Sequence, residues 1–175
     1  YNIKYFALSF ANTENDVRYL RSIVGTDPKI ISKIESIQGL NNLEAISKQS
    51  DAILIDRGDL SREIPIENIP SAQKYIIKTV KEGKNNVYVA TNFLESMINS
   101  VGPTRAEIND IHNTLADGAD GLVLAAETAI GDYPIQCATM IKKMIIQFES
   151  SIYQRGNIIK DLVRKESLIL PRPHG

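Results

Sequence analysis

Short, almost continuously apolar runs alternate along this chain with longer segments in which apolar residues recur every three or four positions. The first pattern is typical of parallel strands buried on both faces, and the second is typical of helices that bury one face. The apolar runs begin roughly 25 to 35 residues apart, close to the length of a βα unit. Five strands are predicted in this way, over residues 5–10, 30–35, 52–56, 87–91 and 121–125.

The helical segments between these runs carry recognisable start and stop signals. Thr104 and Glu107 form the sequence pattern of a capping box, Pro134 suits a first helical turn, and Gly25 and Gly83 suit helix ends. The order is strand then helix, five times over, which predicts an α/β fold with a parallel sheet and outer helices. The helices are expected near residues 17–24, 40–46, 71–82, 104–115 and 134–148.

Polar side chains gather where the predicted strands end. In a (β/α) barrel that edge of the sheet is the active-site face. Lys33 and Glu35 are two residues apart on one strand and therefore point to the same face. An ammonium and a carboxylate in that place suit a site for a divalent metal and an anionic substrate. The polar residues of this edge are Ser9, Glu35, Asp59, Thr91 and Glu127.

Length and composition bound the function. The chain has 175 residues, enough for one domain with a sizeable core, and a formal net charge of −1 gives no electrostatic reason to expect nucleic acid. No apolar run reaches the roughly 18 residues of a membrane span, so we expect no membrane partner. The single cysteine, Cys137, excludes an intramolecular disulfide and favours a cytoplasmic location.

Five βα units account for the whole chain, whereas a complete barrel takes about 250 residues. We therefore expect an incomplete barrel that belongs to a longer protein. Residues 1–150 would form the partial barrel, and residues 151–175 a C-terminal helix and a linker toward a further domain.

A series of short motifs points to one family. Each is weak alone, but together they resemble pyruvate kinase in order and spacing over about residues 4 to 148. The motifs are ISKIE at 31–35, RGDL at 57–60, EIP at 63–65, AT at 90–91, LESM at 94–97, PTRAE at 103–107, DGAD at 117–120, ETA at 127–129 and GDYP at 131–134.

The resemblance implies the fourth to eighth strands of a TIM-type pyruvate kinase barrel, and it implies roles for individual positions. Lys33 matches the lysine that stabilises the enolate, and Glu35 and Asp59 match the carboxylates that hold Mg²⁺, with Mn²⁺ as a substitute. Gly58, Asp59 and Thr91 match positions that contact substrate, and Ser9 matches a serine that lines the same pocket. We further expect Thr91 to help position the proton donor.

The implied activity is the glycolytic transfer of a phosphoryl group from phosphoenolpyruvate to ADP, which yields pyruvate and ATP through an enolate. Metal ions and ammonium groups that face developing negative charge lower the barrier of such a reaction. The implied partners are these small molecules, with a homo-oligomer or a larger chain as the assembly. The family also binds K⁺, but the R-x-N-x-S segment that supplies its usual ligands is not in this sequence.

Several positions depart from the family pattern. Asp56 stands where a small residue precedes Arg-Gly-Asp, Ala125-Ala126 replaces Ser-Gly, and residues 168–175 faintly resemble the start of ATP sulfurylase. An alternative is therefore a non-kinase module of a fusion protein that binds Mg²⁺ and a 2-oxo acid or enolpyruvate. Another is a different reaction at the same enolate site, such as a carbon–carbon lyase. On the kinase interpretation, 175 residues alone should show little turnover, because the phosphate and nucleotide contacts are missing.

Overall fold

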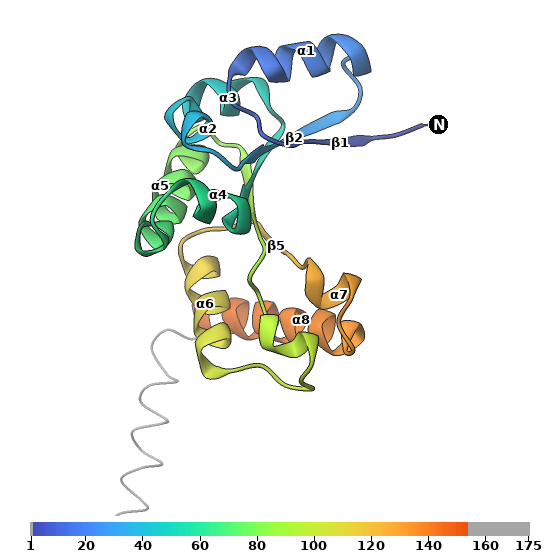
Figure 1. The fold of residues 1–175 in the computed structure, drawn as a ribbon, viewed down its shortest axis with the longest axis vertical. Coiled ribbons are helices and arrows are strands. Elements are labelled where there is room, and N and C mark those ends of the chain that lie inside the picture. The colour runs from blue at the N-terminus through green and yellow to red at the C-terminus, as the bar shows by residue number, and fades with distance from the viewer. Residues whose placement is uncertain (1, 154–175) are drawn as a thin grey trace, which may run out of the picture.

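The computed structural model describes residues 2–153, which form one parallel sheet with helices packed beside it (Figure 1). The sheet has five strands in the order β1-β2-β3-β4-β5, so each strand pairs with its neighbours in the sequence and β1 and β5 lie at the edges. This is the strand order of an incomplete (β/α) barrel, which confirms the predicted fold class. The strands are β1 Tyr5–Leu8, β2 Lys29–Ile34, β3 Ala52–Asp56, β4 Asn86–Ala90 and β5 Gly121–Val123.

The register of the strands separates two faces of the sheet. Lys33 of β2 lies beside Leu54 of β3, which lies beside Tyr88 of β4, and all three are partly exposed. The residues that alternate with them, such as Ile34, Ile53 and Val87, are fully buried. One face therefore packs against the helices, and the other face carries Lys33, Leu54 and Tyr88.

Four of the five predicted helices are confirmed, and the prediction for residues 40–46 is wrong in detail. That segment holds two short helices, which meet at Asn42, because the backbone there is not helical, with φ −102° and ψ 14°. Two helices were not predicted: α4, which starts directly after β3, and the short α7. The helices are α1 Glu14–Val24, α2 Ile37–Asn41, α3 Leu43–Gln49, α4 Arg57–Glu63, α5 Ile69–Glu82, α6 Arg105–Ala116, α7 Ala126–Ala129 and α8 Pro134–Tyr153, with 3₁₀ turns η1 Ile66–Asn68 and η2 Glu95–Ile98.

The capping box at the start of α6 is confirmed. Thr104 Oγ1 accepts a hydrogen bond from the Glu107 N–H at 3.3 Å, and Glu107 Oε2 accepts one from the Thr104 N–H at 2.7 Å. Ser96 donates to the same carboxylate through its N–H and its hydroxyl. Burial opposes the charge of Glu107, but these hydrogen bonds outweigh it and lower the pKa of the carboxyl group. Glu107 thus joins η2 to α6.

The last helix closes the described part of the chain. α8 packs against α6 and α7 and buries Cys137 and Ile141 (Figure 1). The expected C-terminal helix includes residues 151–153 as the end of α8, and residues 154–175 lie outside the described residues. In the part of the chain that the structure describes, no helix is long and apolar enough to cross a membrane.

Candidate functional site

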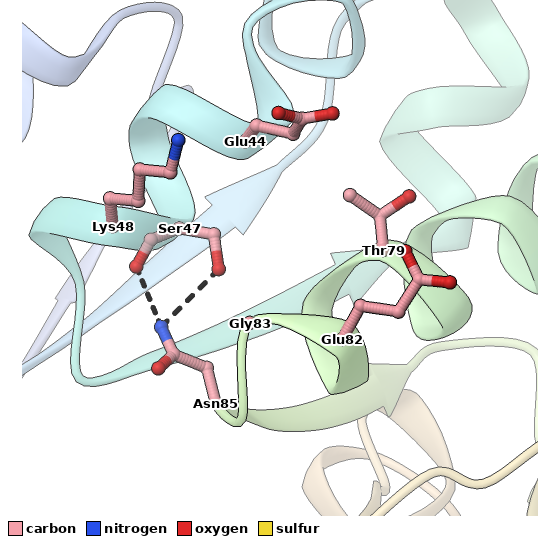
Figure 2. A pocket seen from close by; sticks show the side chains of 7 residues that line it. All are labelled: Glu44, Ser47, Lys48, Thr79, Glu82, Gly83 and Asn85. Atoms are coloured by element: carbon pink, nitrogen blue, oxygen red, sulfur yellow. Dashed lines mark hydrogen bonds between the residues drawn. The ribbon is translucent and has the colours of Figure 1, made fainter.

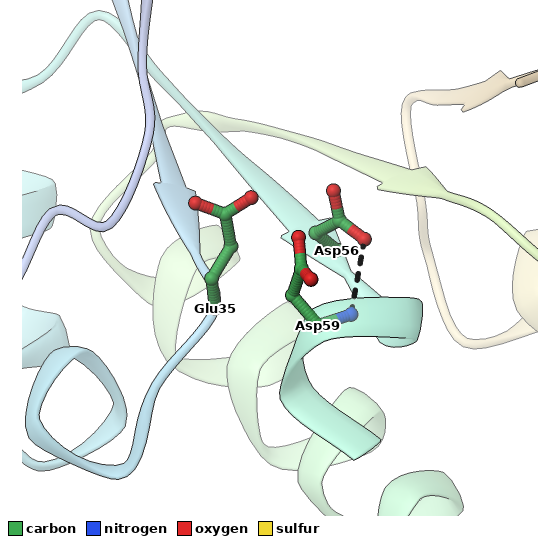
Figure 3. A group of neighbouring side chains, drawn as sticks. All are labelled: Glu35, Asp56 and Asp59. Atoms are coloured by element: carbon green, nitrogen blue, oxygen red, sulfur yellow. Dashed lines mark hydrogen bonds between the residues drawn. The ribbon is translucent and has the colours of Figure 1, made fainter. Parts of the chain in front are cut away.

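Three carboxylates meet at the carboxyl ends of β2 and β3. Glu35 follows β2, Asp56 is the last residue of β3, and Asp59 lies in the first turn of α4 (Figure 3). One carboxylate oxygen from each lies within 4.8 Å of the other two. The short passage from β3 into α4 makes this meeting possible, because the helix turns back over the strand end within three residues.

Lys33 supplies the positive charge of the site. Its Nζ lies 2.5 Å from Glu35 Oε1 and 3.1 Å from Asp56 Oδ2. Burial disfavours the ammonium form, but hydrogen bonds and charge attraction from Glu35 and Asp56 outweigh burial and raise the pKa of Lys33. Lys33 therefore stays protonated at neutral pH, with 21% of its side chain exposed.

Glu35 connects β1 to the site. Its side chain is 1% exposed, and its Oε2 accepts a hydrogen bond of 2.5 Å from the Phe10 N–H in the turn after β1. Ser9 precedes Phe10 in that turn and is exposed. The structure thus places Ser9 at the rim of the site, next to the backbone group that orients Glu35.

Thr91 follows β4 and faces the same region. Its Oγ1 accepts a hydrogen bond of 2.9 Å from the Gly58 N–H. The proton of its hydroxyl has two acceptors, Ala90 O at 2.6 Å and Asp56 Oδ1 at 3.3 Å. Thr91 is also held at a φ of +69°, a left-handed conformation that is costly for a β-branched residue.

The side chain of Arg57 holds the backbone of Thr91 in place. Its Nη2 and Nε donate to Thr91 O at 2.7 and 3.2 Å, and its Nη1 lies 2.9 Å from both carboxylate oxygens of Asp110 on α6. The guanidinium also stacks on Phe93, 4.2 Å from the ring centroid. Arg57 is 7% exposed, so it is a buried clamp between the β4 loop and the helical layer.

Asp59 is the more exposed member of the carboxylate group. Its N–H donates to Asp56 Oδ1 at 3.5 Å, so Asp56 caps the start of α4. Its carboxylate lies 3.2 Å from the guanidinium of Arg62, which is 80% exposed. Such an exposed ion pair is weak, and it leaves the Asp59 oxygens free to change partner.

The donor set fits a hard divalent cation. Mg²⁺ is held by one or two carboxylates plus substrate oxygens, at about 2.1 Å, so two of its ligand oxygens lie at most about 4.2 Å apart. The three carboxylates drawn in Figure 3 offer oxygens that all lie within 4.8 Å of one another, close to the span that one ion requires. Glu35 and Asp59 are therefore placed where they would hold one such ion.

The structure brings together Lys33, Glu35, Gly58, Asp59 and Thr91 of the predicted site, and it places Ser9 at the rim. Sequence reasoning missed Asp56 as a site residue. The signal was present, because Lys33 and Asp56 share a face once Lys33 is paired with Leu54, but that register is a tertiary fact. Glu127, which the sequence placed among the polar residues of this edge, is buried, and its carboxylate accepts the N–H of Ala125 in its own turn.

A pocket elsewhere among the described residues does not bring three carboxylates together. It lies between α3 and the end of α5, and two hydrogen bonds from Asn85 Nδ2 to Ser47 cross its edge (Figure 2). Asn85 directly precedes β4, so this pocket opens at the amino ends of the strands, opposite to the carboxylate group. Its lining residues are Glu44, Ser47, Lys48, Thr79, Glu82, Gly83 and Asn85.

Comparison with known proteins gives a consistent result. Residues 1–138 match the family model described as pyruvate kinase, barrel domain. The chain is 45% identical to the pyruvate kinase of Thermoplasma acidophilum, over 96% of this chain and 32% of that protein. It is 44% identical to that of Thermotoga maritima, over 87% of this chain and 33% of the relative. The pyruvate kinase of Methanocaldococcus jannaschii is 43% identical, over 82% of this chain and 33% of that protein. The chain thus spans about a third of the length of these curated relatives.

Proposed function

The chain belongs to the pyruvate kinase family, and on that premise we propose that it carries the metal and enolate part of phosphoryl transfer from phosphoenolpyruvate to ADP. The observation that carries the proposal is the Lys33 ammonium in contact with Glu35, beside the Asp59 carboxylate, at the carboxyl ends of parallel strands. One cation and a metal-binding carboxylate pair are what a polyanionic substrate with a developing enolate requires.

In this proposal Glu35 and Asp59 hold Mg²⁺, for which Mn²⁺ can substitute. When bound, the divalent cation would neutralise charge on substrate oxygens and on the enolate oxygen. Glu35 is oriented for this role by the Phe10 N–H, and Asp59 by its place in the first turn of α4. The Glu35 carboxylate is thus held by the backbone before a ligand arrives, while the Asp59 carboxylate can leave its exposed partner Arg62 for the cation.

Lys33 provides the second positive charge. The bond between phosphorus and the enol oxygen breaks as the phosphoryl group passes to ADP, and that oxygen keeps the electron pair. The Lys33 ammonium, kept protonated by the carboxylates around it, stabilises this negative charge.

Thr91 and Gly58 position the final proton transfer. The enolate carbon then accepts a proton and becomes the methyl group of pyruvate. The Thr91 hydroxyl is fixed by the Gly58 N–H, so it is suited to orient the proton donor or the water that delivers the proton. Ser9 would line the same pocket from the end of β1. The rest of the proposal follows the family: K⁺ bound by residues outside this chain, a homo-oligomer or larger chain, and a cytoplasmic location.

The experiment that tests the proposal is a calorimetric titration of this chain with Mn²⁺, with and without oxalate as a mimic of the enolate. We expect Mn²⁺ to bind, oxalate to bind only with the metal present, and Lys33→Ala to lose the oxalate. If a folded sample binds oxalate equally well with Lys33→Ala, the assignment of Lys33 is wrong.

The kinase and its main alternative share this binding and differ in turnover. A non-kinase module would bind Mn²⁺ and oxalate but would transfer no phosphoryl group to ADP, even in the longer parent protein. The relatives at 43 to 45% identity are named pyruvate kinase, which supports the kinase. Formation of ATP from phosphoenolpyruvate and ADP by the longer protein would decide for it.

A further inference from the structure

Asp56 touches three other members of the site. Its Oδ2 lies 3.1 Å from the Lys33 Nζ, and its Oδ1 lies 3.3 Å from the Thr91 Oγ1 and 3.5 Å from the Asp59 N–H nitrogen. Its side chain is only 10% exposed, so water screens these contacts little. The Asp56 carboxylate is therefore built into the site and fixed on both of its oxygens.

The contact with Lys33 has a consequence for anionic ligands. An ammonium group has three N–H donors, and in this structure two of them point to Glu35 and Asp56. An anion that reaches Lys33 must share it with the Asp56 carboxylate, and that carboxylate repels the anion. Asp56 thus competes with the substrate for the charge of Lys33.

Asp56 has the opposite effect on a divalent cation, because its negative charge attracts the cation. One oxygen of Asp56 lies within 4.8 Å of oxygens of both Glu35 and Asp59, so a cation held by those two would also face the Asp56 charge. The number of charged ligands is one of the main factors that set the affinity of a cation site.

We propose that Asp56 is a specificity-determining residue of this site, which strengthens binding of the divalent cation and weakens binding of the anionic ligand by sharing Lys33. The inference rests on the proposed function, because it needs Glu35 and Asp59 as the metal ligands and Lys33 as the anion contact. Its content is the trade between the two affinities, which those three residues alone do not imply.

The test uses Asp56→Asn, which removes the charge but keeps an acceptor for Thr91 and the Asp59 N–H, and Asp56→Ala as a second variant. Calorimetry would measure Mn²⁺ binding without an anion and then oxalate binding at saturating Mn²⁺. We expect Mn²⁺ affinity to fall about tenfold and oxalate affinity to rise about tenfold in both variants. Asp27→Asn is the matched control. It removes an exposed carboxylate just before the amino end of β2, and it should change neither affinity.

The two affinities are expected to change in opposite directions, and a purely structural role of Asp56 would not produce that result. A variant that weakens both Mn²⁺ and oxalate, with a lowered unfolding midpoint, would show that Asp56 only supports the fold, and unchanged affinities would also overturn the proposal. The proposed function is tested in parallel by Glu35→Gln. If Glu35→Gln leaves Mn²⁺ binding unchanged, the metal site itself is wrong. If Glu35→Gln loses Mn²⁺ while Asp56→Asn has no effect, only the role of Asp56 is wrong.

Discussion

The two ends of the sheet carry charged groups of opposite design. At the amino ends, Asp51 is matched by two cations, with Arg21 Nη2 at 2.6 Å and Lys29 Nζ at 2.9 Å, and it also accepts the Ile30 N–H. At the carboxyl ends, the Lys33 ammonium faces Glu35 and Asp56, with Asp59 nearby. In the first group two cations face one carboxylate, whereas in the second group three carboxylates gather around one lysine.

The difference separates a structural ion pair from the binding site that we propose. Burial raises the pKa of Asp51, but the Ile30 N–H, Lys29 and Arg21 outweigh burial and lower that pKa to about 2. The contacts of Asp51 therefore hold α1 and β2 to the start of β3. The carboxyl-end group keeps oxygens available, because among residues 2–153 its only other cation is the exposed Arg62 beside Asp59. An added cation would relieve the repulsion that remains.

The largest effect on the free energy of unfolding should come from Arg57, which links the carboxyl ends of the strands to the helices. Arg57→Leu removes the buried clamp on Thr91 and leaves Asp110 without its partner, so we expect the free energy of unfolding to fall by about 3 kcal/mol. Urea denaturation would measure the loss. Arg62→Leu, in the same helix but 80% exposed, is the control and should lie within about 0.5 kcal/mol of the wild type. Equal losses in the two variants would argue against the clamp.

Next in size is Glu35→Gln, which sharpens the comparison from the functional side. Glutamine keeps an acceptor for the Phe10 N–H but removes the charge, so Mn²⁺ affinity should fall on the order of 100-fold while the unfolding midpoint changes little. Calorimetry and urea denaturation would measure the two quantities. The control is Glu44→Gln beside the pocket of Figure 2, which should leave Mn²⁺ affinity as it is. A Glu35→Gln protein that binds Mn²⁺ as well as the wild type would contradict the proposal that the carboxyl-end group holds a cation.

Asp51→Asn is the mirror experiment at the amino ends. It should lower the free energy of unfolding by about 1 kcal/mol at pH 7 and leave Mn²⁺ binding unchanged. The pKa of Asp51 is lower in the folded state than its usual value of about 3.9. The ionised Asp51 therefore stabilises the fold above about pH 4, and this contribution declines toward pH 2. The gap between wild type and variant should therefore narrow as the pH falls. A gap that is the same at pH 7 and pH 3 would contradict this assignment.

The smallest effect should come from Lys29→Met. Lys29 pairs with Asp51 but is 60% exposed, so its loss should cost less than about 1 kcal/mol. The informative partner is Lys33→Met, which should instead abolish metal-dependent oxalate binding. If Lys29→Met also reduced oxalate binding, the two ends of the sheet would not be independent.

Much of the fold was predictable from local patterns. Five apolar runs and the periodic segments between them predicted the strands, the order β-α repeated five times, and four of the helices. The capping box of Thr104 and Glu107 was predicted because both partners lie within one helical turn. The split at Asn42 and the helices α4 and α7 were missed. In α4 the residues Arg57-Gly58-Asp59 follow the strand without a loop, so no sequence signal separates strand from helix.

The sequence by itself determined which residue types stand at the strand ends, and that Lys33 and Glu35 share a face, because both follow from the alternation of side chains along one strand. Its motifs also indicated the family. Only the tertiary structure decided which groups meet across strands. The β2–β3 register sets Lys33 beside the Asp56 carboxylate, and Arg57 reaches Asp110 across 53 positions of chain. Contacts of that kind depend on how separate elements pack, and a single sequence does not display that packing.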